Sequence, residues 1–285
     1  MALWDAIWLG IIQGLTEFLP VSSSAHIRVL GEFLPGAADP GATFTAITQI
    51  GTEIAVLIYF RKDLWNIARS WLVWAKNPSL AKATMSDGER QSVRLGWLII
   101  VGSLPLAITG YLAQDIIRSS LRSLWLVAWV FVLFGIVLWA ADHFGKKVGT
   151  LETLTTSHGV LYGLAQTLAL IPGVSRSGAT ITMGRALGYT RHDTARYSFL
   201  LAIPAVMGSG LYELRTALVR PELNGHFTLG ETAVATAVSF VVGFAVIAWL
   251  MKYIQTRSFL PFVIYRIVAG VAIMVLLSAG VLQPL

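Results

Sequence analysis

Residues 10–26 combine an apolar helix with side chains that could do chemistry. The stretch is GIIQGLTEFLPVSSSAH, and its polar members include Gln13, Glu17, three consecutive serines and His26. Because Gln13 and Glu17 are four residues apart, they share one face of a helix. A carboxylate in hydrocarbon is costly and usually marks a functional site, although a buried polar network without a reactive role is the alternative. A carboxylate, hydroxyls and an imidazole this close together favour nucleophilic or proton-transfer chemistry.

A second stretch, PGVSRSGAT beginning at Pro172, adds a cation to a similar pattern. Proline interrupts a helix, and serine favours the start of the next one. One serine in each stretch is explained as an N-cap, Ser22 in the first and Ser175 or Ser177 in the second. Capping does not explain Arg176. The free N–H groups of a helix start suit a phosphate, and an arginine beside them suits it better.

The two stretches align with each other as an internal repeat. GIIQGLTEFLPVSSS and GLAQTLALIPGVSRS match without a gap, at polar as well as apolar positions. The alignment sets Ser23 against Arg176, and Glu17 against Leu170. One copy therefore carries a hydroxyl and an acid where the other carries a cation. This broken symmetry favours a catalytic site over a symmetric transport site.

The elements that must position these residues are membrane helices. Of 285 residues 55% are hydrophobic and 13% charged, with a mean hydropathy of +0.69, which indicates an integral membrane protein. No cysteine is present, so thiolate nucleophiles and zinc-thiolate sites are excluded. A spanning helix needs about 20 apolar residues. The predicted spans are residues 43–60, 95–112, 124–141, 198–214, 232–251 and 260–282.

The sequence predicts one all-α polytopic membrane domain, residues 1–285, built from two related halves. Residues 1–145 and 146–285 each hold one short polar-tipped segment followed by three spans. An odd number of spans inserts the second half upside down, which is an inverted-topology repeat. The short segments, 3–34 and 158–190, are predicted to be re-entrant helical hairpins whose tips meet near the membrane midplane, since irregular backbone at that depth must be buried or line a wet cavity.

The basic residues predict an orientation. If the connection over residues 61–94 faces the cytoplasm, 14 of the 21 Lys and Arg lie inside, five lie outside, and Arg176 and Arg266 lie at membrane depth. The positive-inside rule favours this arrangement, with both termini outside. The net charge of +6 is spread over these loops, so we expect no nucleic-acid partner. The five outer residues are Arg28, Arg118, Arg122, Arg215 and Arg220.

Two further ionisable residues are predicted at membrane depth. Glu53 follows Gln49 by four residues, so the pair shares a helix face that could line the cavity. A buried ion pair between Glu53 and Arg266 is an equally good interpretation. Arg266 is expected to be structural.

The two motifs resemble the signatures of the bacterial undecaprenyl-diphosphatases, also called bacitracin-resistance proteins. The likeness extends along nearly the whole chain, including QIG at Gln49 and FLLAIP at Phe199. The family's first motif has Glu or Gln followed four residues later by Glu. The positions that match the family's two motifs are Gln13, Glu17, Ser23, His26, Ser175, Arg176 and Thr180.

The resemblance implies a fold of six spans with two re-entrant hairpins, in the bacterial inner membrane. It implies hydrolysis of undecaprenyl diphosphate to the monophosphate and inorganic phosphate, on the outer side, which recycles the lipid carrier of cell-wall synthesis and confers bacitracin resistance. It also implies a divalent cation, Mg²⁺ or Ca²⁺, which we assign to Gln13 and Glu17. Gln13 in place of Glu lowers the negative charge available to that cation.

The expected catalytic residues are Glu17, Ser23, His26 and Arg176. Ser23 is the preferred nucleophile, with Glu17 or His26 as its activator, since His26 lies one helical turn beyond it. Attack by His26 itself or by a metal-bound water is the alternative. A transporter or flippase of an anionic prenyl lipid is the rival function, because inverted repeats with broken helices also serve transporters. The expected substrate-binding residues are Gln13, Ser22, Ser24, Ser175, Ser177 and Thr180.

Overall fold

The computed structural model describes residues 2–31, 33, 40–112, 123–220 and 226–283, and within them the regular elements are helices. Six of these helices are long and apolar enough to cross a membrane, one for each predicted span. The predicted all-α membrane fold is therefore confirmed. The six are α3 (Gly41–Tyr59), α6 (Asp87–Leu112), α8 (Leu124–Phe144), α11 (Arg191–Val219), α12 (Leu229–Tyr253) and α13 (Leu260–Ser278).

Two of these helices begin well before their apolar runs. α6 starts at Asp87 and α11 at Arg191, whereas hydropathy placed the spans from residues 95 and 198. Local capping explains the early start of α11, because the Thr190 side chain accepts a hydrogen bond from the backbone N–H of Asp193. The helical hydrogen-bond ladder continues past the hydrocarbon-matched segment, so hydropathy locates a span but not its ends.

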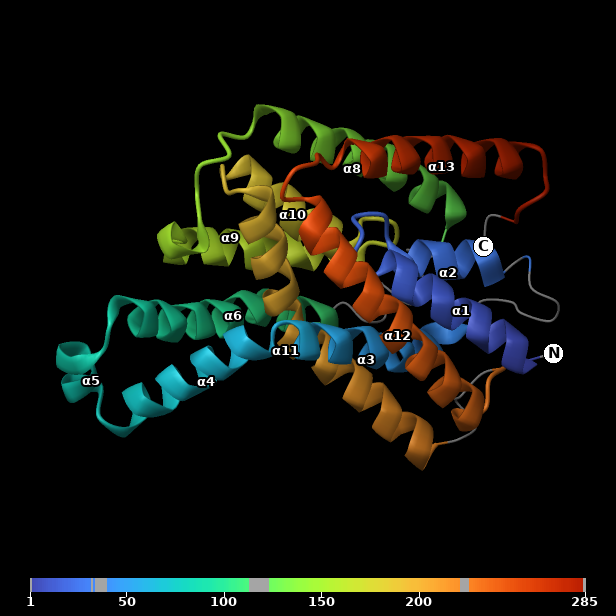
Figure 1. Cartoon of the computed structure of the whole chain (residues 1–285). Coiled ribbons are helices and arrows are strands. Elements are labelled where there is room, and N and C mark those ends of the chain that lie inside the picture. The colour runs from blue at the N-terminus through green and yellow to red at the C-terminus, as the bar shows by residue number, and fades with distance from the viewer. Residues whose placement is uncertain (1, 32, 34–39, 113–122, 221–225, 284–285) are drawn as a thin grey trace.

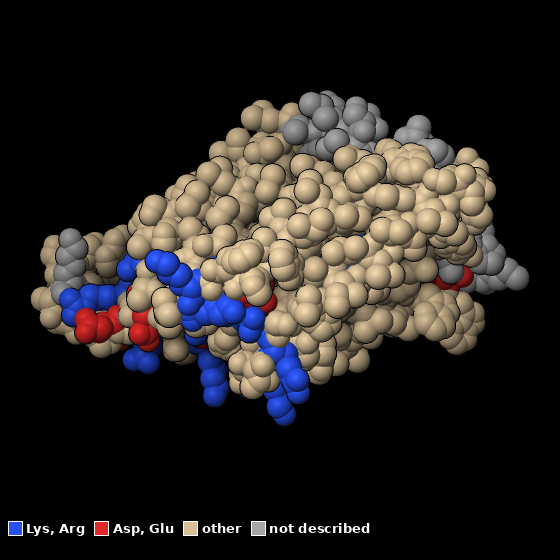
Figure 2. All heavy atoms as spheres, turned by 90° about the horizontal axis from the view of Figure 1, so that it is seen from above, with Lys and Arg blue, Asp and Glu red and all other residues tan. Residues whose placement is uncertain are grey.

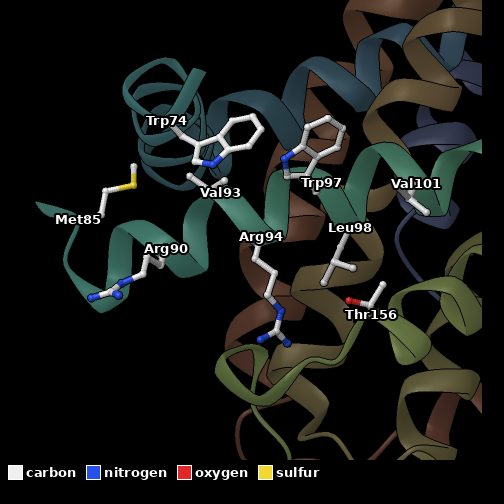
Figure 3. Close-up of a pocket in the computed structure, with 9 residues that line it drawn as sticks. All are labelled: Trp74, Met85, Arg90, Val93, Arg94, Trp97, Leu98, Val101 and Thr156. Atoms are coloured by element: carbon white, nitrogen blue, oxygen red, sulfur yellow. The ribbon is translucent and has the colours of Figure 1, made fainter. Parts of the chain in front are cut away.

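The basic connection predicted as a loop is mostly helical. It forms α4 (Arg61–Lys76) and α5 (Pro78–Thr84), and α4 packs against α6. Trp71 on α4 lies 4.9 Å from Trp97 on α6 between ring centroids. Burial of this aromatic surface against α6 stabilises α4, although α4 carries several charged residues. A cavity of about 330 Å³, lined by Trp74 of α4 and Trp97 of α6 among others and shown in Figure 3, is lined by none of the predicted site residues.

Each polar-tipped segment is two short helices joined by a turn. The first is α1 (Ala2–Thr16) with α2 (Ser23–Gly31). The second is α9 (Thr156–Thr167), the 3-10 helix η2 (Leu168–Leu170) and α10 (Arg176–Ala186). Ser22 and Ser175, equivalent in the repeat, precede α2 and α10 with φ angles of 70° and 71°. This shared left-handed backbone agrees with the sequence repeat, while the inverted topology and the re-entrant insertion remain predictions.

The two turns lie side by side at the centre of the molecule (Figure 1). Arg266 on α13 joins them, because its Nη1 donates to the Pro20 carbonyl of the first turn and to the Val174 carbonyl of the second, both at 3.0 Å. Its Nη2 donates to the Gly173 carbonyl at 2.8 Å, and the side chain is buried. Arg266 is thus structural, as predicted, and the alternative of an ion pair with Glu53 is wrong.

The charged connection and the chain ends occupy opposite ends of the molecule. In Figure 1, α5 lies at the left, whereas the start of α1 and the end of α13 lie at the right. Figure 2 shows Lys and Arg side chains gathered toward one end of the visible face. Most of the rest of that face consists of uncharged residues. This separation agrees with the predicted charge asymmetry. Arg118 and Arg122, two of the five predicted outer residues, lie outside the described residues.

Candidate active site

The Glu17 carboxylate is the centre of the site. It lies just after α1, at the start of the first turn, and the residue is 6% exposed. Its Oε2 accepts hydrogen bonds from Gln13 Nε2 at 2.7 Å and from Ser23 Oγ at 2.6 Å. Its Oε1 accepts from Arg176 Nη2 at 2.8 Å. Groups from both hairpins therefore converge on one carboxylate.

Ser23 has the geometry of an activated nucleophile. It is the first residue of α2, and the turn after Pro20 brings its hydroxyl back over Glu17. A hydroxyl within 2.6 Å of a carboxylate can transfer its proton as its oxygen attacks. The residue is 8% exposed, so the pair lies in a largely water-free environment where electrostatic interactions are strong.

Arg176 brings its positive charge to the pair formed by Glu17 and Ser23. It is the first residue of α10, so its side chain and the free N–H groups of the helix start lie together. Its side chain is 13% exposed, and its Nη1 atom is buried without a hydrogen-bond partner. One half of the guanidinium is thus held by Glu17, and the other half has a donor available for an anionic ligand.

Glu53 on α3 also reaches this site. Its Oε2 lies 3.9 Å from Arg176 Nη2, and neither of its carboxylate oxygens has a hydrogen-bond partner. The sequence placed Glu53 at membrane depth and on a face that could line a cavity, but not beside Arg176. Nothing in the local pattern indicates that α3 turns this face toward the tip of the second hairpin.

His26 makes its hydrogen bonds away from Glu17 and Ser23. Its Nδ1 lies 2.7 Å from the Ser22 carbonyl oxygen, and its Nε2 is hydrogen-bonded to the Tyr265 hydroxyl. The two rings are stacked, with centroids 5.5 Å apart and an interplanar angle of 13°. Both imidazole nitrogens are engaged elsewhere, so the contact expected between His26 and Ser23 is not formed. Tyr265 was missed, because a tyrosine in an apolar span carries no distinguishing sequence signal.

The remaining predicted serines and Thr180 mostly shape the backbone of the tips. Ser177 Oγ donates to the Leu19 carbonyl at 3.1 Å and so ties one turn to the other. Ser175 Oγ caps α10 by accepting from the Gly178 N–H at 3.1 Å. Thr180 Oγ1 donates to the Arg176 carbonyl at 2.9 Å, within its own helix.

Ser22 precedes α2, but its hydroxyl does not cap that helix as expected. It lies 3.3 Å from Ser24 Oγ. In the second hairpin, the equivalent residue, Ser175, does cap the helix that follows it, α10. Substrate-binding roles for these hydroxyls remain predictions.

The oxygen atoms at the tips fit a cation held partly by substrate. Among the described residues no group of three or more His, Asp and Glu gathers to hold a metal ion. Gln13 is fully buried, and its Oε1 has no hydrogen-bond partner, although its Nε2 is bonded to Glu17. Mg²⁺ is commonly held by one or two carboxylates and by substrate phosphates. Gln13 and Glu17 suit a site of that kind.

An apolar groove of about 870 Å³ lies beside the first turn. Leu19 and Val21, which lie between Glu17 and Ser23 in the chain, line it together with Val242 and Trp249 of α12 and Tyr265 of α13. A groove with this lining accommodates a hydrocarbon chain. Two of the residues that line the groove therefore belong to the turn that joins Glu17 to Ser23.

Comparison with known proteins places the chain in a family. Residues 6–272 match the family described as bacitracin resistance protein BacA. A protein of Micrococcus luteus named undecaprenyl-diphosphatase is 57% identical over 279 residues, 98% of each chain. Proteins with the same name from Pseudarthrobacter chlorophenolicus, at 53% identity over 98% of this chain and 99% of theirs, and Clavibacter michiganensis, at 54% over 98% of each, are also similar. With the match covering nearly its whole length, the chain belongs to the BacA bacitracin resistance family.

Proposed function

We propose that this protein is an integral membrane phosphatase that hydrolyses undecaprenyl diphosphate to undecaprenyl phosphate and inorganic phosphate. The observation that carries the proposal is the 2.6 Å hydrogen bond from Ser23 Oγ to Glu17, with Arg176 against the same carboxylate. This arrangement combines a nucleophile, a base and a phosphate-binding cation. The names of the similar proteins support the substrate.

In the proposed reaction, Ser23 Oγ attacks the terminal phosphorus while Glu17 accepts the hydroxyl proton. The bond between that phosphorus and the bridging oxygen breaks, and undecaprenyl phosphate leaves. Glu17 passes its proton to the departing phosphate and then accepts a proton from the water that attacks the phosphoserine. It returns this proton to Ser23 Oγ as the phosphorus–Oγ bond breaks, which releases inorganic phosphate and restores the hydroxyl. Arg176 stabilises the charge on the transferring group through its unpaired Nη1, and the N–H groups at the start of α10 add to this.

His26 is assigned a positioning role in this scheme. Its contacts to the Ser22 carbonyl and to Tyr265 fix the backbone immediately before the nucleophile. Glu17 is the activator that the geometry favours, since it alone of the two contacts Ser23 Oγ.

A Mg²⁺ or Ca²⁺ ion, held by the Gln13 amide oxygen and the Glu17 carboxylate, would neutralise part of the charge on the diphosphate. Phosphate release should therefore stop when excess chelator is added and resume when either ion is restored. Full activity in chelator would remove the cation from the mechanism.

The site is proposed to face the outer side of the bacterial inner membrane, with the prenyl chain in the apolar groove. The support is the separation of the basic connection over residues 61–94 from the chain ends, combined with the positive-inside rule. Tags on the two termini should be accessible from outside intact spheroplasts. A cytoplasmic carboxyl terminus would reverse this orientation.

The decisive experiment for the activity is phosphate release by purified protein in detergent, with undecaprenyl diphosphate as substrate and Ser23→Ala as the control. A parent protein that releases phosphate while the variant does not supports the proposal. A parent that releases none, but moves the lipid between leaflets of proteoliposomes, would establish the rival function of a prenyl-lipid transporter.

A further inference from the structure

Glu53 is a buried carboxylate whose environment in the structure is incomplete. The residue is 0% exposed, and both of its oxygens lack hydrogen-bond partners. Its nearest cation, Arg176, is 3.9 Å away and already donates to Glu17 at 2.8 Å. Buried carboxylates are as a rule paired, hydrogen-bonded or bound to a metal. Glu53 has only one long contact to a cation, and that cation is shared with Glu17.

Gln13 has the complementary deficit. It occupies the motif position at which the family pattern allows Glu or Gln, and its neutral amide contributes no charge to the site. Its Oε1 is buried and unpartnered while its Nε2 donates to Glu17. The first hairpin by itself thus offers a cation one carboxylate and one amide oxygen.

We propose that Glu53 is the second carboxylate of the divalent-cation site, joining Glu17 and the Gln13 amide oxygen. It supplies from α3 the negative charge that the Gln form of the motif lacks. The inference rests on the proposed function, because the cation is the one that the diphosphate reaction would use. Oxygen ligands of this type suit Mg²⁺ or Ca²⁺.

Arg176 in this structure lies where it contacts both carboxylates. A single guanidinium balances only one of two negative charges. When its donors turn to phosphate oxygens, Glu17 and Glu53 both need another counter-ion. A divalent cation would restore neutrality to the two carboxylates while contacting the same phosphates. The arginine and the ion therefore complement each other.

The test measures binding of Ca²⁺ alone to the purified protein in detergent, by equilibrium dialysis. Glu53→Gln keeps the shape of the side chain and removes its charge, and should weaken Ca²⁺ binding about ten- to a hundredfold, as expected for the removal of one charged ligand. Gln13→Glu combined with Glu53→Gln returns the second charge from the other helix and should recover the parent affinity to within about threefold. Glu213→Gln, at a carboxylate bonded to Thr43, is the matched control and should bind as the parent does.

Gln13→Glu alone keeps the inference testable if the Glu53 variants fail to fold. It brings a third carboxylate to the site and should tighten Ca²⁺ binding. Unchanged affinity in Glu53→Gln, or no recovery in the double variant, would overturn the role of Glu53. No gain in Gln13→Glu would remove position 13 from the site that Glu53 is proposed to complete. Phosphate release in chelator separates the two proposals. If the parent protein releases phosphate without a cation, the cation of the proposed function is refuted. If the parent needs a cation but Glu53→Gln binds Ca²⁺ as tightly as the parent does, only the role of Glu53 is refuted.

Discussion

The replacement of Arg176 by lysine tests the site most directly, because it keeps the positive charge and removes the second donor nitrogen. In the structure, Nη2 is held by Glu17 at 2.8 Å, and Nη1 is the unpaired donor available to phosphate. A lysine has one ammonium on a flexible stem and cannot hold Glu17 and a phosphate in the same fixed geometry. Arg176→Lys should therefore bind the diphosphate and its transition state less well.

The magnitude of the effect follows from the hydrogen bonds that lysine cannot make. A hydrogen bond to a charged group contributes about 1.5–3 kcal/mol, and the substitution removes one or two of them. Each 1.36 kcal/mol is a factor of about ten in rate, so kcat/KM should fall roughly ten- to ten-thousand-fold. Folding should be little affected, because the Arg266 hydrogen bonds that join the two turns remain.

The assay is the steady-state release of phosphate in detergent, with thermal unfolding of the same samples to report folding. Arg215→Lys, at an arginine outside the site, is the matched control and should keep the parent kcat/KM. If Arg176→Lys works within about threefold of the parent rate, Arg176 is only a counter-ion to Glu17, and the transition-state role assigned to it is refuted.

Ser23→Ala should nearly abolish phosphate release, whereas Ser24→Ala, at an exposed position expected to bind substrate, should have an intermediate effect. Rapid-quench mass spectrometry should trap acid-stable phosphate on Ser23 of the parent, and acid-labile phosphate on His26 would reassign the nucleophile. Tyr265→Phe removes the hydroxyl bonded to His26 and should lower kcat more than it raises KM; an unchanged kcat would show that this contact does not position the nucleophile. Arg266→Gln leaves buried turn carbonyls without donors, at about 1–3 kcal/mol each. Its unfolding midpoint should fall by roughly 5–15 °C, and a midpoint within about 1 °C of the parent would contradict the structural role.

The sequence alone determined the all-helical fold and the positions of its long apolar helices. Hydropathy located the six long apolar helices of the described residues. The free energy of moving a segment from water into the membrane depends on the side chains of that segment alone, so it can be read from the local sequence. The repeat located the two turns, and proline with serine marked where each following helix begins. Glu17 and His26 were both expected near Ser23 from sequence, because all three lie within one hairpin, where the chain itself limits their separation. The structure places Glu17 against Ser23.

Only the tertiary structure decided which distant groups meet at the tips. Arg176 reaches Glu17 across 159 residues, and Glu53 joins them from a third element. These contacts depend on the relative depth and rotation of packed helices, which hydrophobic periodicity does not specify. The same holds for His26, which sequence proximity placed near Ser23 but which packing against α13 turns toward Tyr265. Short-range spacing thus determined which chemical groups are present at the tips, and helix packing decided which of those groups contact each other.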